Sequence, residues 1–316
     1  MTQQTSQEAV DIFDLGLQAD LEMLKRSTLD RRRILKMGAI GIGMFLTGCA
    51  TNTNTASPAT TTTGTLAPST AAAATTAPTM AAATTAPTTA AAATTAPTTA
   101  AAECVSEIPQ ETAGPFPADG SQASRQTLNA LALSGIVRQD IRMSLGTGNV
   151  AAGVPCTIEL TLVNTNANCA PLANYAVYAW HCDRDGNYSM YSNGVTDEDY
   201  LRGVQSSDSA GKVIFSSIFP ACYAGRWPHV HFEIYPSLEQ ATAANNAIHT
   251  SQLGMPKDVC DTVFATDGYA QSVKNLSQIS LDTDNVFRDG YSTQIATLTG
   301  DVRNGYRAAL TVGVAV

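Results

Sequence analysis

Alternating hydrophobic and polar positions dominate the chain from about residue 155 onward. Runs with this pattern, or rich in β-branched residues, predict β-strands because successive side chains on a strand point to opposite faces. Clusters of Gly, Asn, Asp and Pro separate the runs, which cover 157–163, 176–181, 212–219, 230–235 and 306–314. Helical periodicity is weak and predicts helix only around 238–248 and near Val273. The pattern therefore predicts an all-β fold, an antiparallel β-sandwich with long loops and little helix.

The segment before this domain has a different composition. Residues 50–103 are nearly all Ala, Thr and Pro, and Thr-Thr-Ala-Pro-Thr recurs at 75–79, 84–88 and 94–98. With almost no large apolar side chains, burial cannot offset the entropy of ordering this backbone. We therefore predict a disordered tether over 50–103, followed by one domain of ordinary size over 104–316.

An export signal is predicted at the start of the chain. Arg31 and the two arginines after it precede an apolar run, 37–46, that is too short to span a bilayer. This order is typical of a twin-arginine signal, and the following Leu-Thr-Gly-Cys49 resembles the lipobox of bacterial lipoproteins. Residues 1–49 are thus predicted to be a lipoprotein signal, and the protein to be exported and lipid-anchored through Cys49 at the bacterial cell envelope. The alternative is a buried core helix followed by a chance cysteine.

The charge distribution limits the partners of the domain. The whole chain carries a formal net charge of −9, and from Cys104 onward 20 Asp and Glu face 12 Lys and Arg. An acidic domain without basic clusters is a poor nucleic-acid binder and gains nothing from an anionic membrane surface. We therefore expect no nucleic-acid partner and membrane attachment through Cys49 alone. The oligomeric state stays open.

Six cysteines remain if Cys49 is lipidated. In an exported domain an even number suggests up to three disulfides, with fifteen possible connectivities. The competing interpretation is a zinc site, which is disfavoured because no Cys-x-x-Cys pair exists. The six are Cys104, Cys156, Cys169, Cys182, Cys222 and Cys260.

Two histidines lie one residue apart on a predicted strand. Side chains at i and i+2 share a face, so His229 and His231 can reach one metal ion. A lone pair of this kind is about as often on the surface or hydrogen-bonded, so further ligands are needed. Glu233 is too close to His231 on the strand to complete a cupin-type ligand set. The intervening side chains are predicted to face the core: Val230, Phe232 and Ile234.

Tyrosine is the better candidate for the remaining ligands. Tyr223 lies six residues before His229, in a predicted turn that leads into the strand. A phenolate is a hard anionic oxygen ligand that suits iron(III), and binding to that ion depresses the phenol pKa.

These segments resemble the intradiol ring-cleavage dioxygenases, the catechol and protocatechuate dioxygenase family. The stretch 219–235 is similar to the second half of the family's active site, and 175–188 to its first half, with Trp180, Gly186 and Tyr188 at the family's positions. Matching stretches also occur at 201–205, 207–211 and 249–253. The resemblance covers 104–316 and is closest to the exported, single-domain branch.

The resemblance implies one non-haem Fe(3+) and a defined ligand set. Its metal ligands are Tyr188, Tyr223, His229 and His231. The implied enzyme uses dioxygen to cleave catechol-type rings between the two hydroxyl-bearing carbons, giving a muconate-type product. The implied catalytic residues are Tyr223, which leaves the metal and takes a substrate proton, and Arg226, which stabilises developing negative charge. Gln252 matches a glutamine that supports the site without binding the metal, a position that a buried structural Gln would also fit. His181 and His249 are expected to be structural.

One departure from the family pattern bears on the substrate. Phe116 stands where some members have a tyrosine at the pocket, and no basic cluster is evident to bind a ring carboxylate. Plain, alkyl-substituted or polyphenolic catechols are therefore expected rather than protocatechuate. The alternative function is a catalytically silent, envelope-tethered β-sandwich that binds carbohydrate or protein. A zinc hydrolase at the same histidines is disfavoured because tyrosines are unusual zinc ligands.

Overall fold

The computed structural model describes residues 104–124 and 127–316. The predicted signal, Cys49 and the predicted tether lie outside the described residues, so export and lipid anchoring stay predictions. Within the described ranges, no helix has the length and apolar character needed to cross a membrane.

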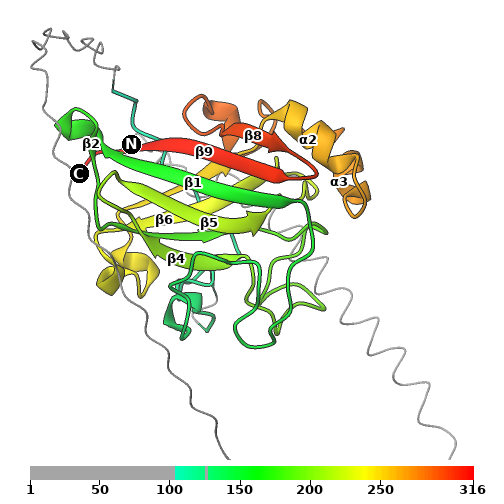
Figure 1. Ribbon diagram of the computed structural model, residues 1–316, viewed down its shortest axis with the longest axis horizontal. Helices are drawn as coiled ribbons and strands as arrows, with labels where there is room; N and C mark the ends of the chain where they lie inside the picture. The colour runs from blue at the N-terminus through cyan, green and yellow to red at the C-terminus, as the bar shows by residue number, and fades with distance from the viewer. Residues whose placement is uncertain (1–103, 125–126) are drawn as a thin grey trace, which may run out of the picture. The chain divides into compact units, whose positions relative to one another are not determined.

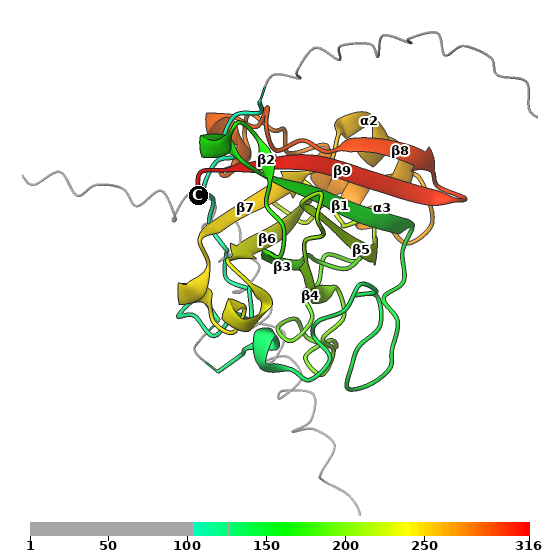
Figure 2. The same ribbon diagram turned by 60° about the vertical axis from the view of Figure 1, so that its left-hand side comes forward.

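The domain is built from two packed β-sheets (Figures 1 and 2). The first contains, in order, β2 (Ala170–Pro171), β1 (Pro155–Asn164), β9 (Gly305–Val314) and β8 (Thr297–Asp301), and β5 (Lys212–Ile218) also pairs with β1. The second has the order β4 (Arg202–Ser206), β3 (Ala176–Trp180), β6 (His229–Tyr235) and β7 (His249–Gly254). The strand pairs are antiparallel except β1 and β9, which run parallel. The predicted all-β sandwich is confirmed, with one parallel pair that the pattern did not reveal.

Apart from the two-residue β2, the strands that the pattern missed are short and polar. The five predicted runs became β1, β3, β5, β6 and β9, whereas β4, β7 and β8 carry Arg, Gln, Ser, Thr and Gly where alternation would require apolar residues. These strands are fixed by pairing with their neighbours, which is a long-range effect.

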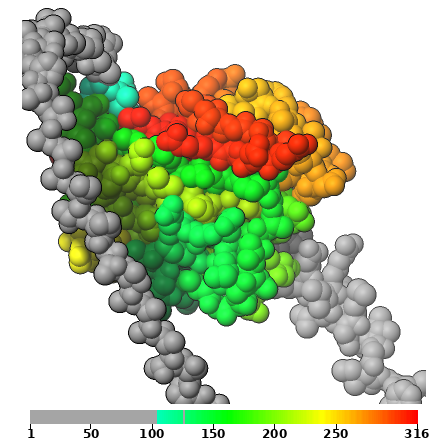
Figure 3. All heavy atoms as spheres, in the orientation of Figure 1, coloured from blue at the N-terminus to red at the C-terminus, as the bar shows by residue number. Residues whose placement is uncertain are grey.

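The helix predictions were correct at one of two places. The helix α3 (Ala270–Leu276) contains Val273, but the predicted helix at 238–248 is wrong, because this segment forms 3-10 turns at Leu238–Gln240 and Ala244–Asn246. Neither turn begins with a capping side chain, and neither buries a residue that could hold a longer helix. The helix α2 (Lys257–Phe264) was not predicted, although its buried residues follow helical spacing: Cys260, Val263 and Phe264. The helix α2 lies beside β8 in both ribbon views, and α3 packs on α2. Figure 3 shows this C-terminal part of the chain, coloured gold to red, along one side of the domain surface.

The four-stranded sheet is buried on both faces. On its inner face, Val230, Phe232 and Ile234 of β6 join the core between the sheets, as the alternation predicted. On its outer face, Tyr178 and Trp180 of β3 pack in a second apolar cluster under the loops. A sheet in a sandwich commonly exposes its outer face to water. Covering this face with loops creates an enclosed environment for the polar side chains that point outward from β6.

The turn between β4 and β5 explains one sequence motif. Asp208 accepts hydrogen bonds through Oδ1 from the backbone N–H groups of Ala210 and Lys212, at 2.8 and 2.9 Å. Gly211 has a φ of +76°, and a Cβ there would clash with the carbonyl oxygen of Leu162 on β1. The Ser-Asp-x-x-Gly stretch therefore serves the turn that takes the chain from the four-stranded sheet to the five-stranded one, rather than the chemistry.

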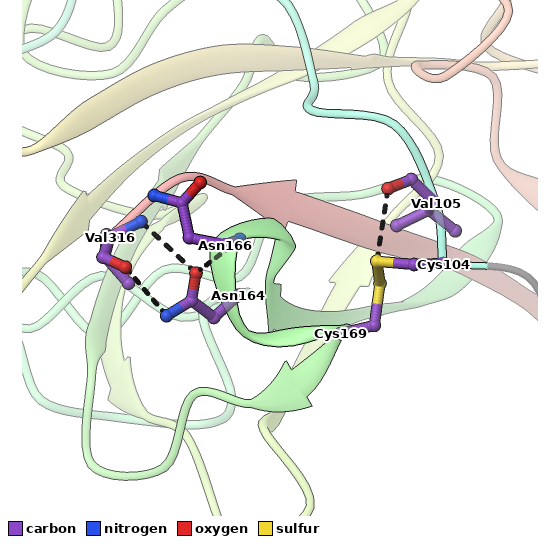
Figure 4. Close-up of a disulfide and its surroundings, with 6 residues drawn as sticks. All are labelled: Cys104, Val105, Asn164, Asn166, Cys169 and Val316. Atoms are coloured by element: carbon purple, nitrogen blue, oxygen red, sulfur yellow. Dashed lines mark hydrogen bonds between the residues drawn. A yellow bond between two sulfur atoms is a disulfide. The ribbon is translucent and has the colours of Figure 1, made fainter.

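A disulfide fastens the beginning of the described chain to the loop after β1 (Figure 4). Cys104 pairs with Cys169, with Cα atoms 5.4 Å apart, and Asn164 close by donates to the carbonyl oxygen of Val316 at 2.8 Å. One of the up to three predicted disulfides is thus present. The other four described cysteines are buried free thiols: Cys156, Cys182, Cys222 and Cys260.

Candidate metal centre

The histidine pair lies on the outer face of the four-stranded sheet. His229 begins β6 and His231 follows on the same face, and both are 2% exposed. Their Nε2 atoms are 3.0 Å apart, which confirms the geometry predicted from the strand period. Both nitrogen atoms can therefore face one small volume.

Two tyrosines complete the cluster from separate loops. Tyr188 follows the turn after β3, and its hydroxyl is 3.4 Å from Nε2 of His229 and 3.2 Å from Nε2 of His231. Tyr223 lies before β6, with its hydroxyl 3.4 Å from Nε2 of His229. The left-handed Gly186, with φ +86°, lets the two loops approach, because a Cβ there would be only 3.2 Å from Cβ of Tyr223. The structure thus brings all four predicted ligands together.

Hydrogen bonding orients the neutral imidazole of His229. Its Nδ1 donates to the carbonyl oxygen of Trp227, which leaves a lone pair on Nε2. Burial and the nearby Arg226 cation lower the pKa of His229 to about 3.

His231 is held by stacking. The ring of Trp180 lies parallel to it, with centroids 4.9 Å apart and an interplanar angle of 5°. Burial, followed by the neighbouring His229, lowers the pKa of His231. Its Nδ1 has no hydrogen-bond partner among the described residues, so the ring is oriented by this stacking and by the contacts of its Nε2 with Tyr188 and His229. Trp180 therefore supports the site directly, a role that the sequence did not assign to it.

The donor chemistry of the cluster fits a hard trivalent ion. Two neutral imidazole nitrogens and two phenol oxygens converge in a buried site, and ionised phenols would balance two of the three charges of iron(III). Across 104–124 and 127–316 there is no group of three or more His, Cys, Asp or Glu side chains that could hold a metal ion. A metal ion bound at this cluster would therefore have to take tyrosine oxygens among its ligands, and the described cysteines form no such group.

Arg226 lies in a buried polar network rather than at the surface. It is 0% exposed, its Nη2 donates to Oε1 of Gln252 at 2.6 Å, and its Nε donates to Oδ2 of Asp284 at 3.0 Å. The structure therefore joins Arg226, predicted to be catalytic, to Gln252, predicted to support the site, and places both in the interior. Asp284 also accepts from the backbone N–H of Trp227 at 2.6 Å, so it fixes the chain between Tyr223 and the start of β6.

Asp284 was missed by the sequence analysis. It lies 53 residues after His231 in a loop rich in Asp, Ser and Thr, with no period or motif to mark it. Burial raises its pKa, but the Arg226 cation and the N–H groups around it outweigh burial, so the net pKa is lowered. The carboxylate therefore stays ionised as the counter-ion of Arg226.

A second carboxyl group approaches this network. Gln294 donates through Nε2 to Oε1 of Glu111 at 3.2 Å and to the carbonyl oxygen of Gln252 at 3.3 Å. Burial and the nearby Asp289 raise the pKa of Glu111 from 4.5 to about 7. Glu111 therefore holds its proton more tightly than an exposed glutamate does.

Phe116 packs directly against a predicted ligand. Its ring stacks on Tyr188 with centroids 4.9 Å apart and an interplanar angle of 26°, and it meets Tyr191 edge-on at 5.2 Å. The residue expected at the pocket thus contacts the site, and it presents no hydroxyl group there.

The remaining two histidines lie outside the cluster. His181 is buried and contacts the hydroxyl of Ser217 through Nε2 at 2.6 Å and the carbonyl oxygen of Cys182 through Nδ1 at 2.7 Å. His249 is buried on β7, where its backbone pairs with Ile234. Glu233 accepts from the hydroxyl of Tyr235 at 2.6 Å, in agreement with its exclusion as a ligand.

Solved intradiol dioxygenases match this fold at low sequence identity. An intradiol ring-cleavage dioxygenase from Tetranychus urticae is 23% identical at a TM-score of 0.48, over 58% of this chain and 88% of that one. The dioxygenase domain of a dioxygenase and carbohydrate-binding protein fusion from Streptomyces sp. SirexAA-E is 20% identical at a TM-score of 0.38, over 57% and 88%. Catechol 1,2-dioxygenase from Pseudomonas arvilla C-1 is 20% identical at a TM-score of 0.37, over 58% of each chain. No family model and no curated protein matches the chain. The matches concern the fold, and the roles of single side chains are therefore argued from their geometry.

Proposed function

We propose that this domain binds one non-haem iron(III) through Tyr188, Tyr223, His229 and His231, and uses dioxygen to cleave catechol-type rings between their two hydroxyl-bearing carbons. The observation that carries the proposal is the convergence of four buried donor atoms, two phenol oxygens and two imidazole nitrogens, at separations of 3.0 to 3.4 Å. Iron(III), when bound, supplies the positive charge that ionises the phenols and activates a chelated catechol toward dioxygen.

The side chains of this domain have separate tasks in the proposal. Tyr223 lies in the turn before β6 and is 5% exposed, against 1% for Tyr188, so it is the tyrosine with more access to an incoming substrate. Its phenolate would accept a catechol proton at its oxygen atom. Arg226 carries a fixed positive charge beside the histidines, held by Asp284 and Gln252, and would stabilise negative charge that develops on the ring.

The surroundings of the cluster favour an uncharged aromatic substrate. Phe116 presents an apolar ring next to Tyr188, and Trp180 covers His231. The cation beside the histidines, Arg226, already has a carboxylate partner in Asp284. We therefore propose plain, alkyl-substituted or polyphenolic catechols as substrates in place of carboxylated ones.

The proposal is tested by oxygen uptake and product analysis. Iron-loaded protein should consume one dioxygen per catechol and give a muconate-type dicarboxylic acid. An extradiol product would contradict the proposed chemistry. Absence of turnover in protein that retains iron, together with binding of carbohydrate or another protein, would favour the catalytically silent binding module instead.

A further inference from the structure

A second buried arginine lies on the same face of the sheet and has no role in the proposed chemistry. Arg202 begins β4, pairs across the sheet with Trp180, and is 1% exposed. Unlike Arg226, which is neutralised by Asp284, it directs its guanidinium at neutral oxygen atoms. Burying a cation among neutral groups costs several kcal/mol, as an order of magnitude, so an apolar residue would serve packing alone at lower cost.

All five N–H groups of this guanidinium can be accounted for. Its Nη1 donates to the carbonyl oxygen of Pro117 at 2.9 Å and to the hydroxyl of Tyr178 at 3.1 Å, and its Nη2 donates to the carbonyl oxygen of Phe116 at 2.9 Å. Ser189 receives the other two bonds, its hydroxyl from Nε and its carbonyl oxygen from Nη2, both at 3.0 Å. Five donors in a rigid planar group thereby join three separate segments, and a lysine, with three donors, cannot make all five bonds.

The joined segments enclose Tyr188. Ser189 is the next residue along the chain, and Phe116 is the residue whose ring stacks on Tyr188. A single atom, Nη2 of Arg202, bonds the carbonyl oxygens of both. Tyr191 also contacts these segments. The Cζ atom of Arg202 lies 5.4 Å from the centroid of its ring, and its hydroxyl accepts from the N–H of Ala118 at 2.8 Å.

We propose that Arg202 is a positioning residue for the iron site: by fastening the backbone of Ser189 to that of Phe116, it fixes the direction of the Tyr188 phenol. This inference rests on the proposed function, because it takes Tyr188 to be a ligand of iron(III). The strand β4 carries no ligand, but through Arg202 it would hold the loop of Tyr188 and Ser189 in place relative to the histidines of β6.

Arg138 provides a matched control. It also fastens a loop to β4, donating through Nε and Nη2 to the carbonyl oxygen of Arg202 at 2.9 and 2.7 Å, and through Nη2 to that of Asp199 at 2.9 Å. Its partner atoms belong to Met143, Asp199 and the backbone of Arg202, and none of them belongs to Phe116 or Ser189, which the Arg202 guanidinium joins. Loss of Arg138 should therefore disturb the same strand without turning the phenol.

The test compares Arg202→Lys, Arg202→Met and Arg138→Lys in the full-length protein after loading with iron(III). The tyrosinate-to-iron absorption band should move in both Arg202 variants and keep its wavelength in Arg138→Lys. The value of kcat/KM with catechol should fall roughly tenfold in Arg202→Lys and about 100-fold in Arg202→Met, because an ångström of misplacement has a cost of that order. Thermal unfolding of the three variants shows how much each substitution destabilises the domain, so that a shift of the band can be compared with a loss of stability.

Ser189→Ala keeps the test decisive if Arg202→Met does not fold. It removes one acceptor of the guanidinium and leaves the arginine in place, so it should move the same band in the same direction by a smaller amount. The inference would be overturned if Arg202→Lys and Ser189→Ala both fold and show the tyrosinate-to-iron band at the wild-type wavelength. Absence of any such band in the wild-type protein would instead overturn the proposed function, so the two failures are distinguishable.

Discussion

The two faces of β6 are equally buried but differ in what buries them. On the inner face, Phe232 packs in the apolar core between two regular sheets, and it is 0% exposed. On the outer face, the neighbouring His231 is covered by Trp180 and Tyr188, and Tyr223 contacts His229 beside it. The inner face needs only apolar residues of suitable volume, whereas the outer face needs particular atoms at particular positions. The core between the sheets thus lies on one face of a single strand, and the site of the proposed chemistry lies on the other.

The difference between the two faces is tested most directly by changing adjacent residues of β6. His231→Ala should reduce iron(III) affinity by more than about 100-fold and abolish turnover, because loss of a ligand exceeds the usual effect of losing an outer hydrogen-bond partner. Phe232→Ala should destabilise the domain by about 3 to 5 kcal/mol through the cavity that it creates, and should keep the iron absorption per folded molecule. Iron titration and denaturant unfolding measure the two effects.

His249→Ala is the control for the first variant, since His249 is buried on the adjacent β7 without joining the cluster. It should retain iron. Loss of iron binding in folded Phe232→Ala, to the same degree as in His231→Ala, would break the division between the two faces.

A smaller effect concerns the carboxyl group that borders the site. Burial and Asp289 raise the pKa of Glu111 to about 7 in the folded protein, so folding favours its protonated form. The stability that this gives is fully present below about pH 4.5 and is lost as the pH rises through about 7. Between these values the free energy of unfolding of the wild type should fall relative to that of Glu111→Gln by up to about 3 kcal/mol.

Denaturant unfolding of the wild type and Glu111→Gln across this pH range measures the difference. A constant difference between pH 4.5 and 7 would show that Glu111 titrates like an exposed glutamate.

The same contrast explains how far the sequence could predict the molecule. Alternation placed His229 and His231 opposite Val230, Phe232 and Ile234, because a strand has a strict period of two. It could not reveal that the outer face is covered, since polar residues at alternate positions are also what a solvent-exposed face would carry.

The supporting residues of the site were harder to predict. Asp284 and Arg202 meet their partners only when separate loops come together, and nothing local in the sequence marks either residue for that role. The two tyrosines were identified through the family resemblance and not through any period. Long-range closure of loops is therefore the part of this site that pattern and propensity do not encode.

The central claim is that tyrosine phenolates bind iron(III) at this cluster, and the visible absorption spectrum of the iron-loaded protein tests it most directly. The account predicts a reddish protein whose tyrosinate-to-iron band shifts when catechol is added. The band should be lost in the double variant Tyr188→Phe, Tyr223→Phe. It should be kept in Tyr235→Phe, because Tyr235 is a buried tyrosine on the same face of β6 as the two histidines but donates to Glu233. A colourless protein after iron loading, or an unchanged band in the double variant, would contradict the account.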